Sequence, residues 1–127
     1  MRLDLPPAPT PVPGDPASIR AVVARLLANA ADVSPPGREI LLSVLPVPTE
    51  GIVLLTISDL GRGVAASDLG RVFSSDVWDK PVQGLGRDAA GLTMVKNLTE
   101  ELGGRVWVES RPSGTTFSVL LPSIAEG

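Results

Sequence analysis

An aspartate followed by two spaced glycines closes the most apolar segment of this 127-residue chain. Residues 52–57 contain only Ile, Val, Leu and Thr, and residues 59–63 then read Asp-Leu-Gly-Arg-Gly. The carboxylate of Asp59 can accept a hydrogen bond from a ligand, while Gly61 and Gly63 allow close backbone approach and unusual backbone angles. Aspartate and glycine also favour turns, so this run by itself predicts a strand-end turn more readily than a binding site.

A second group of polar residues lies on one flank of a predicted amphipathic helix. Projection down the helix axis places Arg25, Asn29 and Asp32 together, beside an apolar face centred near Val22, Val23 and Ala30. Asparagine is unfavourable inside helices, and a solvated flank would explain Asn29 adequately. The alternative is that its amide oxygen occupies one position on Mg²⁺, which uses few protein ligands together with substrate phosphates.

A third feature is the start of a second predicted helix near residue 90. Its first-turn amides and positive dipole end could hold phosphate. The preceding residues 84–89, Gly-Leu-Gly-Arg-Asp-Ala, match the dinucleotide-binding fingerprint letter by letter. No predicted strand precedes them and the sheet is mixed, so the required strand–turn–helix context is missing and the match is rejected. No Walker phosphate loop occurs either.

The elements that must position these residues are helices and pairs of neighbouring strands that read as hairpins. Asp15 and Pro16 supply a helix start, and Gly103 with Gly104 stops the second helix. The predicted strands cover residues 1–5, 39–45, 51–58, 105–110 and 115–121, and the predicted helices cover 16–33, 67–73 and 90–102. Residues 6–16 read as a proline-rich connector and 74–89 as a long mobile loop. This order predicts an α+β two-layer sandwich, a mixed and mostly antiparallel sheet covered on one face by helices.

Composition excludes several kinds of chemistry. The chain contains no cysteine and no histidine, so disulfides, thiol nucleophiles, the commonest general base and an internal phosphohistidine are all excluded. A formal net charge of −3 without a basic cluster argues against nucleic acid as a partner. No apolar run could span a bilayer and no signal peptide is apparent, so we expect a cytoplasmic domain without membrane contact, or the cytoplasmic part of a larger protein.

Five motifs in this order resemble the ATP-binding catalytic domain of sensor histidine kinases, in the GHKL superfamily. The resemblance covers nearly the whole chain, and it implies a single domain over residues 1–127 with the Bergerat-type ATP-binding fold. The motifs are the N box (14–16 leading to 26–30), the G1 box (59–63), the F box (69–73), the end of the G2 box (90–96) and the closing hairpin (103–110 with 114–117).

The resemblance implies roles for individual residues. Asp59 would bind the adenine amino group, Gly63 would line the adenine pocket, and Asn29 would coordinate Mg²⁺. Residues 74–89 would form a lid over the phosphates, and the Thr116 hydroxyl would support Asp59 directly or through water. The implied ATP-binding residues are Asn29, Asp32, Asp59, Gly61, Gly63, Phe73, Gly84, Gly86, Gly91, Leu92 and Thr116, with Asn29 as the metal ligand.

The chain departs from the family pattern at the phosphate end. Arg25 stands where the N box usually has its first asparagine, and Asp32 stands where a basic residue is common. A carboxylate near a triphosphate is repulsive unless Mg²⁺ or Arg25 offsets it. In the G2 box two of the usual three glycines are Arg87 and Ala89, and Gly84 with Gly86 could be their displaced counterparts. The adenine site therefore looks intact, whereas the phosphate site looks altered.

The favoured function is a histidine kinase catalytic domain that positions Mg-ATP for transfer to a histidine on another segment or chain, with a response regulator downstream. Such a domain would be inactive alone, and we expect a monomer because no helical dimerisation segment is present. Arg25, Asp32 and Ala89 favour the alternative of a non-catalytic interaction module. A serine kinase resembling anti-sigma factors ranks last, because the closing hairpin and the G2 helix resemble sensor kinases more closely.

Overall fold

The computed structural model describes residues 2–4, 16–34, 37, 39–61, 63–74, 85 and 91–122. The expected connector before Pro16 and most of the expected lid, including Gly84 and Gly86, lie outside these residues. The described part contains the elements that carry the remaining candidate residues.

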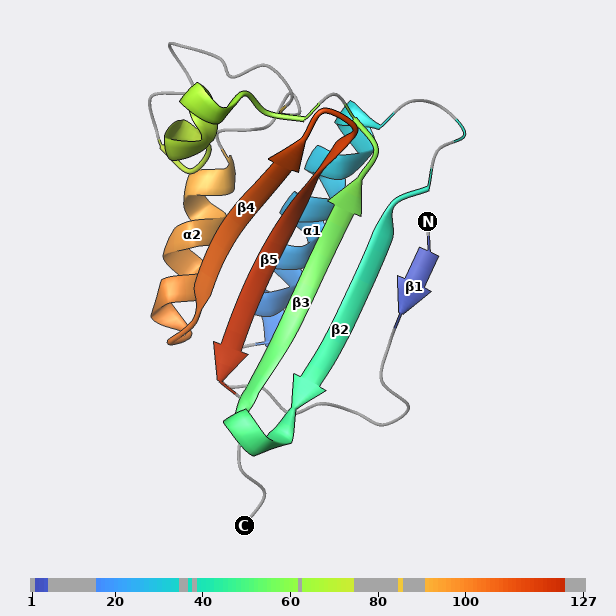
Figure 1. Ribbon diagram of the computed structural model, residues 1–127. Helices are drawn as coiled ribbons and strands as arrows, with labels where there is room; N and C mark the ends of the chain where they lie inside the picture. Colours follow the sequence, from blue (N-terminus) through green and yellow to red (C-terminus); the bar gives the residue numbers. More distant parts are fainter. Residues whose placement is uncertain are drawn as a thin grey trace.

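Five strands form one sheet, and two helices cover one of its faces (Figure 1). The strands are β1 (Arg2–Asp4), β2 (Leu41–Val47), β3 (Ile52–Asp59), β4 (Arg105–Arg111) and β5 (Gly114–Pro122), in the spatial order β1-β2-β3-β5-β4. β1 pairs in parallel with β2, and every other pair is antiparallel. The helices are α1 (Pro16–Val33) and α2 (Gly91–Glu101). The predicted α+β two-layer sandwich is thereby confirmed.

The two central strands carry the residues that face the helices. Successive side chains of a strand point to opposite faces, and Val53, Ile57 and Asp59 are the buried residues of β3. β5 lies antiparallel to β3 in a register that sets Ile57 opposite Phe117. The same register brings Asp59, the last residue of β3, onto the helix-covered face at the end of the sheet.

Both helices bury apolar residues at helical spacing. On α1 the fully buried positions include Val22, Leu26 and Ala30, one turn apart. On α2 the buried residues are Leu92, Val95 and Thr99, and Leu98 is partly buried. The apolar face predicted for α1 near Val22 and Ala30 is therefore buried, and the buried face of α2 includes a polar threonine.

Glycines end α2 as the sequence predicts. Gly103 adopts a left-handed φ of +82°, and its N–H donates to the carbonyl of Glu100 at 3.0 Å. The N–H of Gly104 donates to the carbonyl of Thr99 at 2.9 Å. These two bonds satisfy carbonyl groups that the last helical turn would otherwise leave open, and the chain then enters β4.

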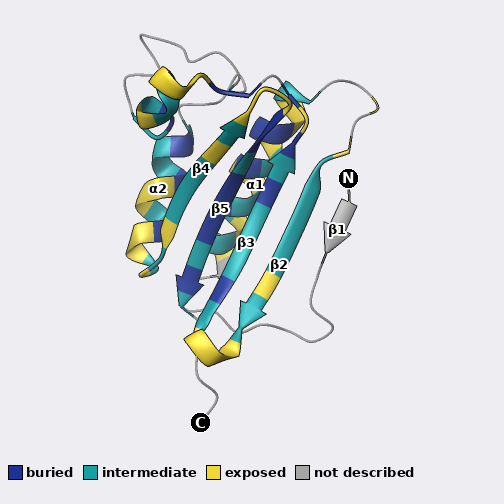
Figure 2. Cartoon of the chain, viewed as in Figure 1, coloured by how far each residue is buried: buried dark blue, intermediate teal, exposed yellow. Residues whose placement is uncertain are grey.

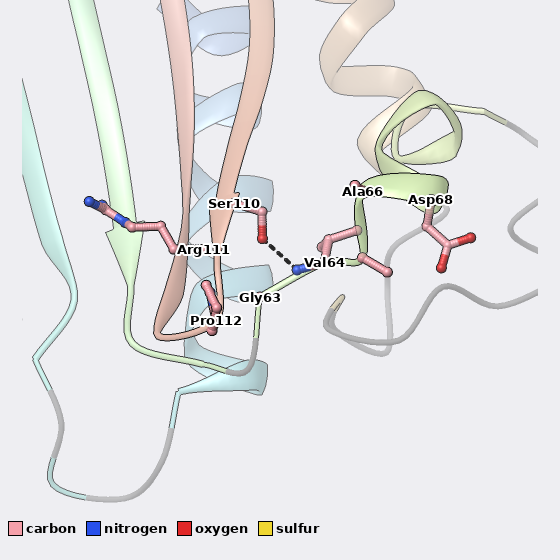
Figure 3. Close-up of a pocket in the computed structure, with 8 residues that line it drawn as sticks. Gly63, Val64, Ala66, Asp68, Ser110, Arg111 and Pro112 are labelled. Carbon is pink, nitrogen blue, oxygen red and sulfur yellow. Dashed lines mark hydrogen bonds between the residues drawn. The ribbon is translucent and has the colours of Figure 1, made fainter.

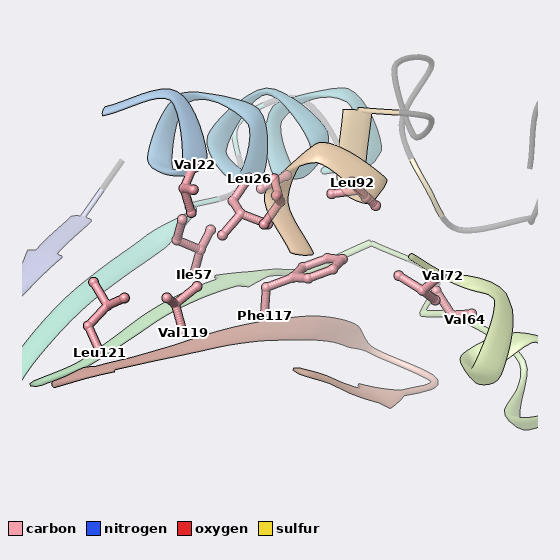
Figure 4. Close-up of a cluster of buried hydrophobic side chains, with 11 residues drawn as sticks. Val22, Leu26, Ile57, Val64, Val72, Leu92, Phe117, Val119 and Leu121 are labelled. Carbon is pink, nitrogen blue, oxygen red and sulfur yellow. The ribbon is translucent and has the colours of Figure 1, made fainter. Parts of the chain in front are cut away.

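The hydrophobic core lies between the helices and the sheet, with the Phe117 ring at its centre (Figure 4). Burial is concentrated along β5 and on the helix sides that face it (Figure 2). Phe73 packs edge-on against Phe117, with ring centroids 5.9 Å apart and an interplanar angle of 78°. The buried apolar residues are Val22, Leu26, Ala30, Ile57, Val64, Val72, Leu92, Val95, Phe117, Val119 and Leu121.

Two elements differ from their sequence-based description. β2 begins at Leu41 and continues through Pro46 to Val47, although proline cannot donate to a sheet ladder. β1 pairs only with residues 41–43, so in the described part of the sheet Pro46 has β3 as its single neighbour. The short helix after the glycines is a 3₁₀ helix over Ala66–Arg71, shorter than the predicted 67–73 at its C-terminal end.

Candidate functional site

Asp59 is a buried carboxylate whose two oxygens have different surroundings. The residue is 4% exposed, and Oδ1 accepts a hydrogen bond from the Gly61 N–H at 2.9 Å. Oδ2 is also buried, but it has no hydrogen-bond partner in the described structure. One oxygen therefore holds its own loop in shape. The other is an orphaned buried acceptor, an arrangement that native proteins seldom keep without a functional reason.

Burial also alters the acidity of this group. Desolvation raises the pKa of Asp59 above its ordinary value of 3.8, because burial penalises the charged form. Backbone hydrogen bonds from Gly61 and Thr115 act in the opposite direction and only partly offset the desolvation. In the folded chain without a ligand, the environment of the Asp59 carboxyl therefore disfavours its ionised form. A ligand that donates a hydrogen bond to Oδ2 would favour the ionised form.

The two glycines of this loop lie where a side chain has no room. A Cβ on Gly61 would lie 2.8 Å from the carbonyl oxygen of Val33, at the end of α1. Gly63 has a left-handed φ of +77°, and a Cβ there would overlap the carbonyl oxygen of Arg111. The next N–H, that of Val64, donates to Ser110 Oγ at 2.5 Å (Figure 3). Glycine is therefore required by the backbone packing on both sides of the loop.

The structure corrects the role expected for Thr116. Its hydroxyl is hydrogen-bonded to Ser58 Oγ at 2.9 Å, and both residues lie on the sheet face opposite to Asp59. Thr115 is the residue paired with Asp59, and its Oγ1 is a second buried polar atom that has no hydrogen-bond partner. A ligand group or a water reaching Asp59 Oδ2 could satisfy both orphaned atoms. Strand alternation from the inward-facing Phe117 was the signal that could have identified Thr115.

Asn29 is buried, which rules out the solvated-flank explanation. It is 5% exposed, whereas Arg25 one turn before it and Asp32 nearly one turn after it are both exposed. The buried amide of Asn29 thus lies on α1 between two exposed charged residues. In this position it could face a ligand that also reaches those charges. Asn29 also takes part in an interaction within the protein, although its side-chain Nδ2 is buried without a hydrogen-bond partner in the described structure.

The first residue of α2 lies close to α1. A Cβ on Gly91 would be 3.2 Å from Arg25 Cδ and 3.3 Å from Arg25 Nη1. Leu92 is turned into the core at 1% exposure, so its contribution is packing. Thr93 Oγ1 donates to the carbonyl of Phe73 at 3.0 Å and joins the helix start to the end of the F box. Phe73 thus packs against Phe117 through its ring and contacts the start of α2 through its carbonyl.

Helix α1 links these groups into one site. Gly91 contacts Arg25 near its middle, Gly61 approaches Val33 at its end, and Asn29 lies halfway between. At a rise of about 1.5 Å per residue, Arg25 and Val33, which are eight positions apart, are separated by about 12 Å along the axis. One end of this strip carries a buried acceptor in a tight backbone loop, and the other carries a cation beside a helix N-terminus. The arrangement suits an elongated ligand with a polar base at one end and negative charge at the other.

A separate hollow of about 530 Å³ lies beyond Gly63, on the side of the β4–β5 turn (Figure 3). Gly63 is the one candidate residue among the described ones that lines it, and Asp59 does not face it. The side chains of Arg111 and Asp68 extend in opposite directions (Figure 3). The hollow therefore does not coincide with the strip along α1. Its lining residues are Gly63, Val64, Ala65, Ala66, Asp68, Ser110, Arg111 and Pro112.

Comparison with known proteins identifies the family to which the chain belongs. Residues 14–124 match the family model described as "Histidine kinase-, DNA gyrase B-, and HSP90-like ATPase". The chain belongs to this family of ATPases, and within it to the ATP-binding domains of sensor histidine kinases. The motif-based resemblance and the ATP-binding assignment are both confirmed.

Individual sensor histidine kinases are similar to this chain in sequence, in structure or in both. The chain is 34% identical to the "Probable sensor histidine kinase TcrY" of Mycobacterium tuberculosis over 94% of its own length and 25% of TcrY. It is 26% identical to the mycobacterial sensor histidine kinase MprB, with a TM-score of 0.80 over 98% of this chain and 85% of that one. Full-length ShkA, solved with AMPPNP, shares the fold at a TM-score of 0.81 and 21% identity, covering 99% of this chain and 26% of ShkA.

The chain therefore spans about a quarter of the length of TcrY, the curated relative compared above. No helix within the described residues is long and apolar enough to cross a membrane.

Proposed function

We propose that this chain binds Mg-ATP along α1 and positions the γ-phosphate for transfer to a histidine supplied by another segment or chain. The observation that carries the proposal is Asp59, with one oxygen held by its own loop and the other buried without a partner. An exocyclic amino group of adenine is the kind of donor that would satisfy Oδ2. Gly61 and Gly63 allow the flat base to approach the backbone closely.

Asn29 is the candidate magnesium ligand. Mg²⁺ usually keeps several waters and takes one or two protein oxygens together with substrate phosphates, so a single amide oxygen is a sufficient protein contribution. The described residues contain no cluster of three or more acidic side chains that could hold a metal without the nucleotide. When bound, the ion would neutralise phosphate charge. Asn29 would orient it, and exposed Asp32 lies nearly one turn further along the same flank.

The phosphoryl acceptor must come from outside this sequence, because the 127 residues contain no histidine. The role of the domain is then positioning and charge neutralisation, which supply most of the catalysis in phosphoryl transfer. A histidine-bearing helical segment is the direct partner in this proposal, and a response regulator would receive the phosphoryl group afterwards. Without the acceptor segment the chain would bind nucleotide but would not transfer it.

Titration of the chain with a non-hydrolysable ATP analogue and Mg²⁺, followed by calorimetry, tests nucleotide binding. We expect saturable binding that weakens when Mg²⁺ is removed. No saturable binding at millimolar nucleotide would contradict the proposal.

Incubation with ATP and a histidine-bearing fragment from the same protein tests transfer. We expect an acid-labile phosphohistidine on the fragment, and its loss in the Asp59→Asn variant. Binding without any transfer would instead favour the non-catalytic interaction module.

A further inference from the structure

The Arg25 side chain lies against the first residue of α2. A Cβ on Gly91 would be 3.2 Å from Cδ, 3.3 Å from Nη1 and 3.5 Å from Nε of Arg25. The guanidinium and the last methylene of Arg25 therefore cover the start of the helix, and glycine leaves them room to do so. Arg25 itself is exposed, so its charge faces solvent at the mouth of the site.

This placement brings two positive groups together. The N-terminus of an eleven-residue helix such as α2 carries a partial positive charge, which disfavours a neighbouring cation. Within the described part of the chain, Arg25 has neither an ion pair nor a hydrogen bond. Asp32 lies two turns further along α1, about 10 Å away along the axis, too distant to offset this repulsion. No described residue offsets this repulsion, and a bound anion would.

The other end of the same strip independently indicates a ligand. Asp59 Oδ2 is an acceptor without a partner in a residue that is 96% buried, since 4% is exposed. α1 connects the two ends, because Arg25 touches Gly91 while Val33 lies against Gly61. A ligand that donates a hydrogen bond to Asp59 would therefore extend its distal, charged portion towards Arg25.

We infer that Arg25 binds the terminal phosphates of the nucleotide and sets the preference of this site for a triphosphate over an uncharged nucleoside. The inference rests on the proposed function and deepens it. A guanidinium can form two parallel hydrogen bonds to phosphate oxygens, and the N–H groups of the first turn of α2 would bind the same group. Arg25 thereby supplies the positive charge on a helix flank that otherwise carries the acid Asp32.

The test compares ligands that share a base but differ in charge. Dissociation constants of adenosine, ADP and a non-hydrolysable ATP analogue are measured by calorimetry for the 127-residue chain and for Arg25→Ala. We expect the affinity for the ATP analogue to fall about tenfold, as for the loss of one charge-assisted contact. The affinity for adenosine should stay unchanged, which also shows that the variant is folded.

Two further variants sharpen the result. Arg25→Lys keeps the charge but loses the planar fork, so its loss should be intermediate. Arg20→Ala removes an exposed arginine from the same helix, away from Gly91, and should leave all three affinities unchanged. The difference between the chain and Arg25→Ala should also shrink as salt rises, because added ions screen an exposed charge.

The outcomes distinguish a failure of the proposed function from a failure of the role of Arg25. If the unmodified chain binds neither adenosine nor the ATP analogue, the proposed function fails and the role of Arg25 fails with it. If it binds both, and Arg25→Ala keeps the original ratio of the two affinities, the proposed function stands and the role of Arg25 is refuted. An equal loss for adenosine and the ATP analogue would also refute it, because Arg25 would then be a packing residue.

Discussion

The two ends of the site along α1 differ in burial and in what fixes their residues in place. At the base end, Asp59, Gly61 and Gly63 are buried, and their positions are fixed by strand register and close backbone contacts. At the phosphate end, Arg25 and Asp32 are exposed side chains on one helix. At the first end a side chain on Gly61 or Gly63 would press against backbone, whereas a residue at the second end can change while the fold stays intact. This contrast explains why the departures from the family pattern gather at the phosphate end.

The largest expected effect is on stability and comes from a substitution at the base end. Gly63→Ala adds a Cβ at a left-handed φ of +77° and against the carbonyl oxygen of Arg111. We expect it to lower the free energy of unfolding by about 2–4 kcal/mol, measured by urea denaturation. Gly70→Ala is the matched control, because a Cβ there meets nothing within 4 Å. An equally small effect of both would show that the base end is less constrained than the contacts imply.

The next effect concerns nucleotide affinity. Asp59→Asn keeps the shape of the side chain but exchanges one acceptor oxygen for a donor nitrogen. We expect the affinity for adenosine and ATP to fall about 10- to 100-fold with the fold intact, as for a lost hydrogen bond to a charged group. Calorimetry and circular dichroism measure the two properties. Unchanged affinity would mean that residues 59–63 form only a turn.

The same variant has a predictable pH dependence. Because the pKa of Asp59 is raised in the folded state, the contribution of this group to stability is fully present below the ordinary aspartate pKa of 3.8 and is lost as pH rises through the raised value. Asparagine does not titrate, so Asp59→Asn should be more stable than the original chain at neutral pH, and the difference should vanish towards acid pH. Denaturation midpoints between pH 3 and 7 measure it. A variant that is less stable at neutral pH would contradict the proposed strain.

A smaller effect distinguishes the two adjacent threonines. Thr115→Val removes a buried hydroxyl opposite Asp59, so nucleotide affinity should fall a few-fold, while stability should hold or rise because an unpaired buried polar atom is removed. Thr116→Val breaks the hydrogen bond to Ser58 on the other face and should leave affinity unchanged. The opposite ranking of the two affinities would restore the original assignment to Thr116.

The smallest effect is expected at the phosphate end. Gly91→Ala places a Cβ 3.2 Å from Arg25 Cδ, but that contact is with a flexible, exposed side chain that can move aside. We expect the free energy of unfolding to change by less than about 1 kcal/mol. A loss as large as that of Gly63→Ala would remove the distinction between the two ends.

Local patterns predicted most of the fold and the base end of the site. Apolar spacing, the Asp15–Pro16 start and the Gly103–Gly104 stop located both helices, and the strand ending in Asp59 followed from its composition. The pairing of β3 with β5, and the parallel pairing of β1, depend on contacts between distant segments, so no local rule gave them. The same limit applies to Arg25. Its position departs from the family pattern, but its contact with Gly91 results from the packing of α1 against α2.

The error at Thr116 has a different origin, because the information was present. Phe117 is an obvious core residue, and alternation along β5 then turns Thr115 inward and Thr116 outward. The burial of Asn29 could not be read in this way. On a helix, the boundary between a buried and a solvated flank shifts with the exact rotation of the helix, and only packing fixes that rotation.

The register between β3 and β5 links nucleotide binding to correct folding of the sheet. Asp59 and Thr115 share a face only when all eight residue pairs from Ile52–Pro122 to Asp59–Thr115 are matched. A slip by one residue would turn one strand's side chains to the other face and dismantle the base end, because side chains alternate with a period of two. The fraction of molecules that bind adenosine is therefore a direct assay of correct strand pairing. Nucleotide added during refolding would enrich the correctly paired form by mass action.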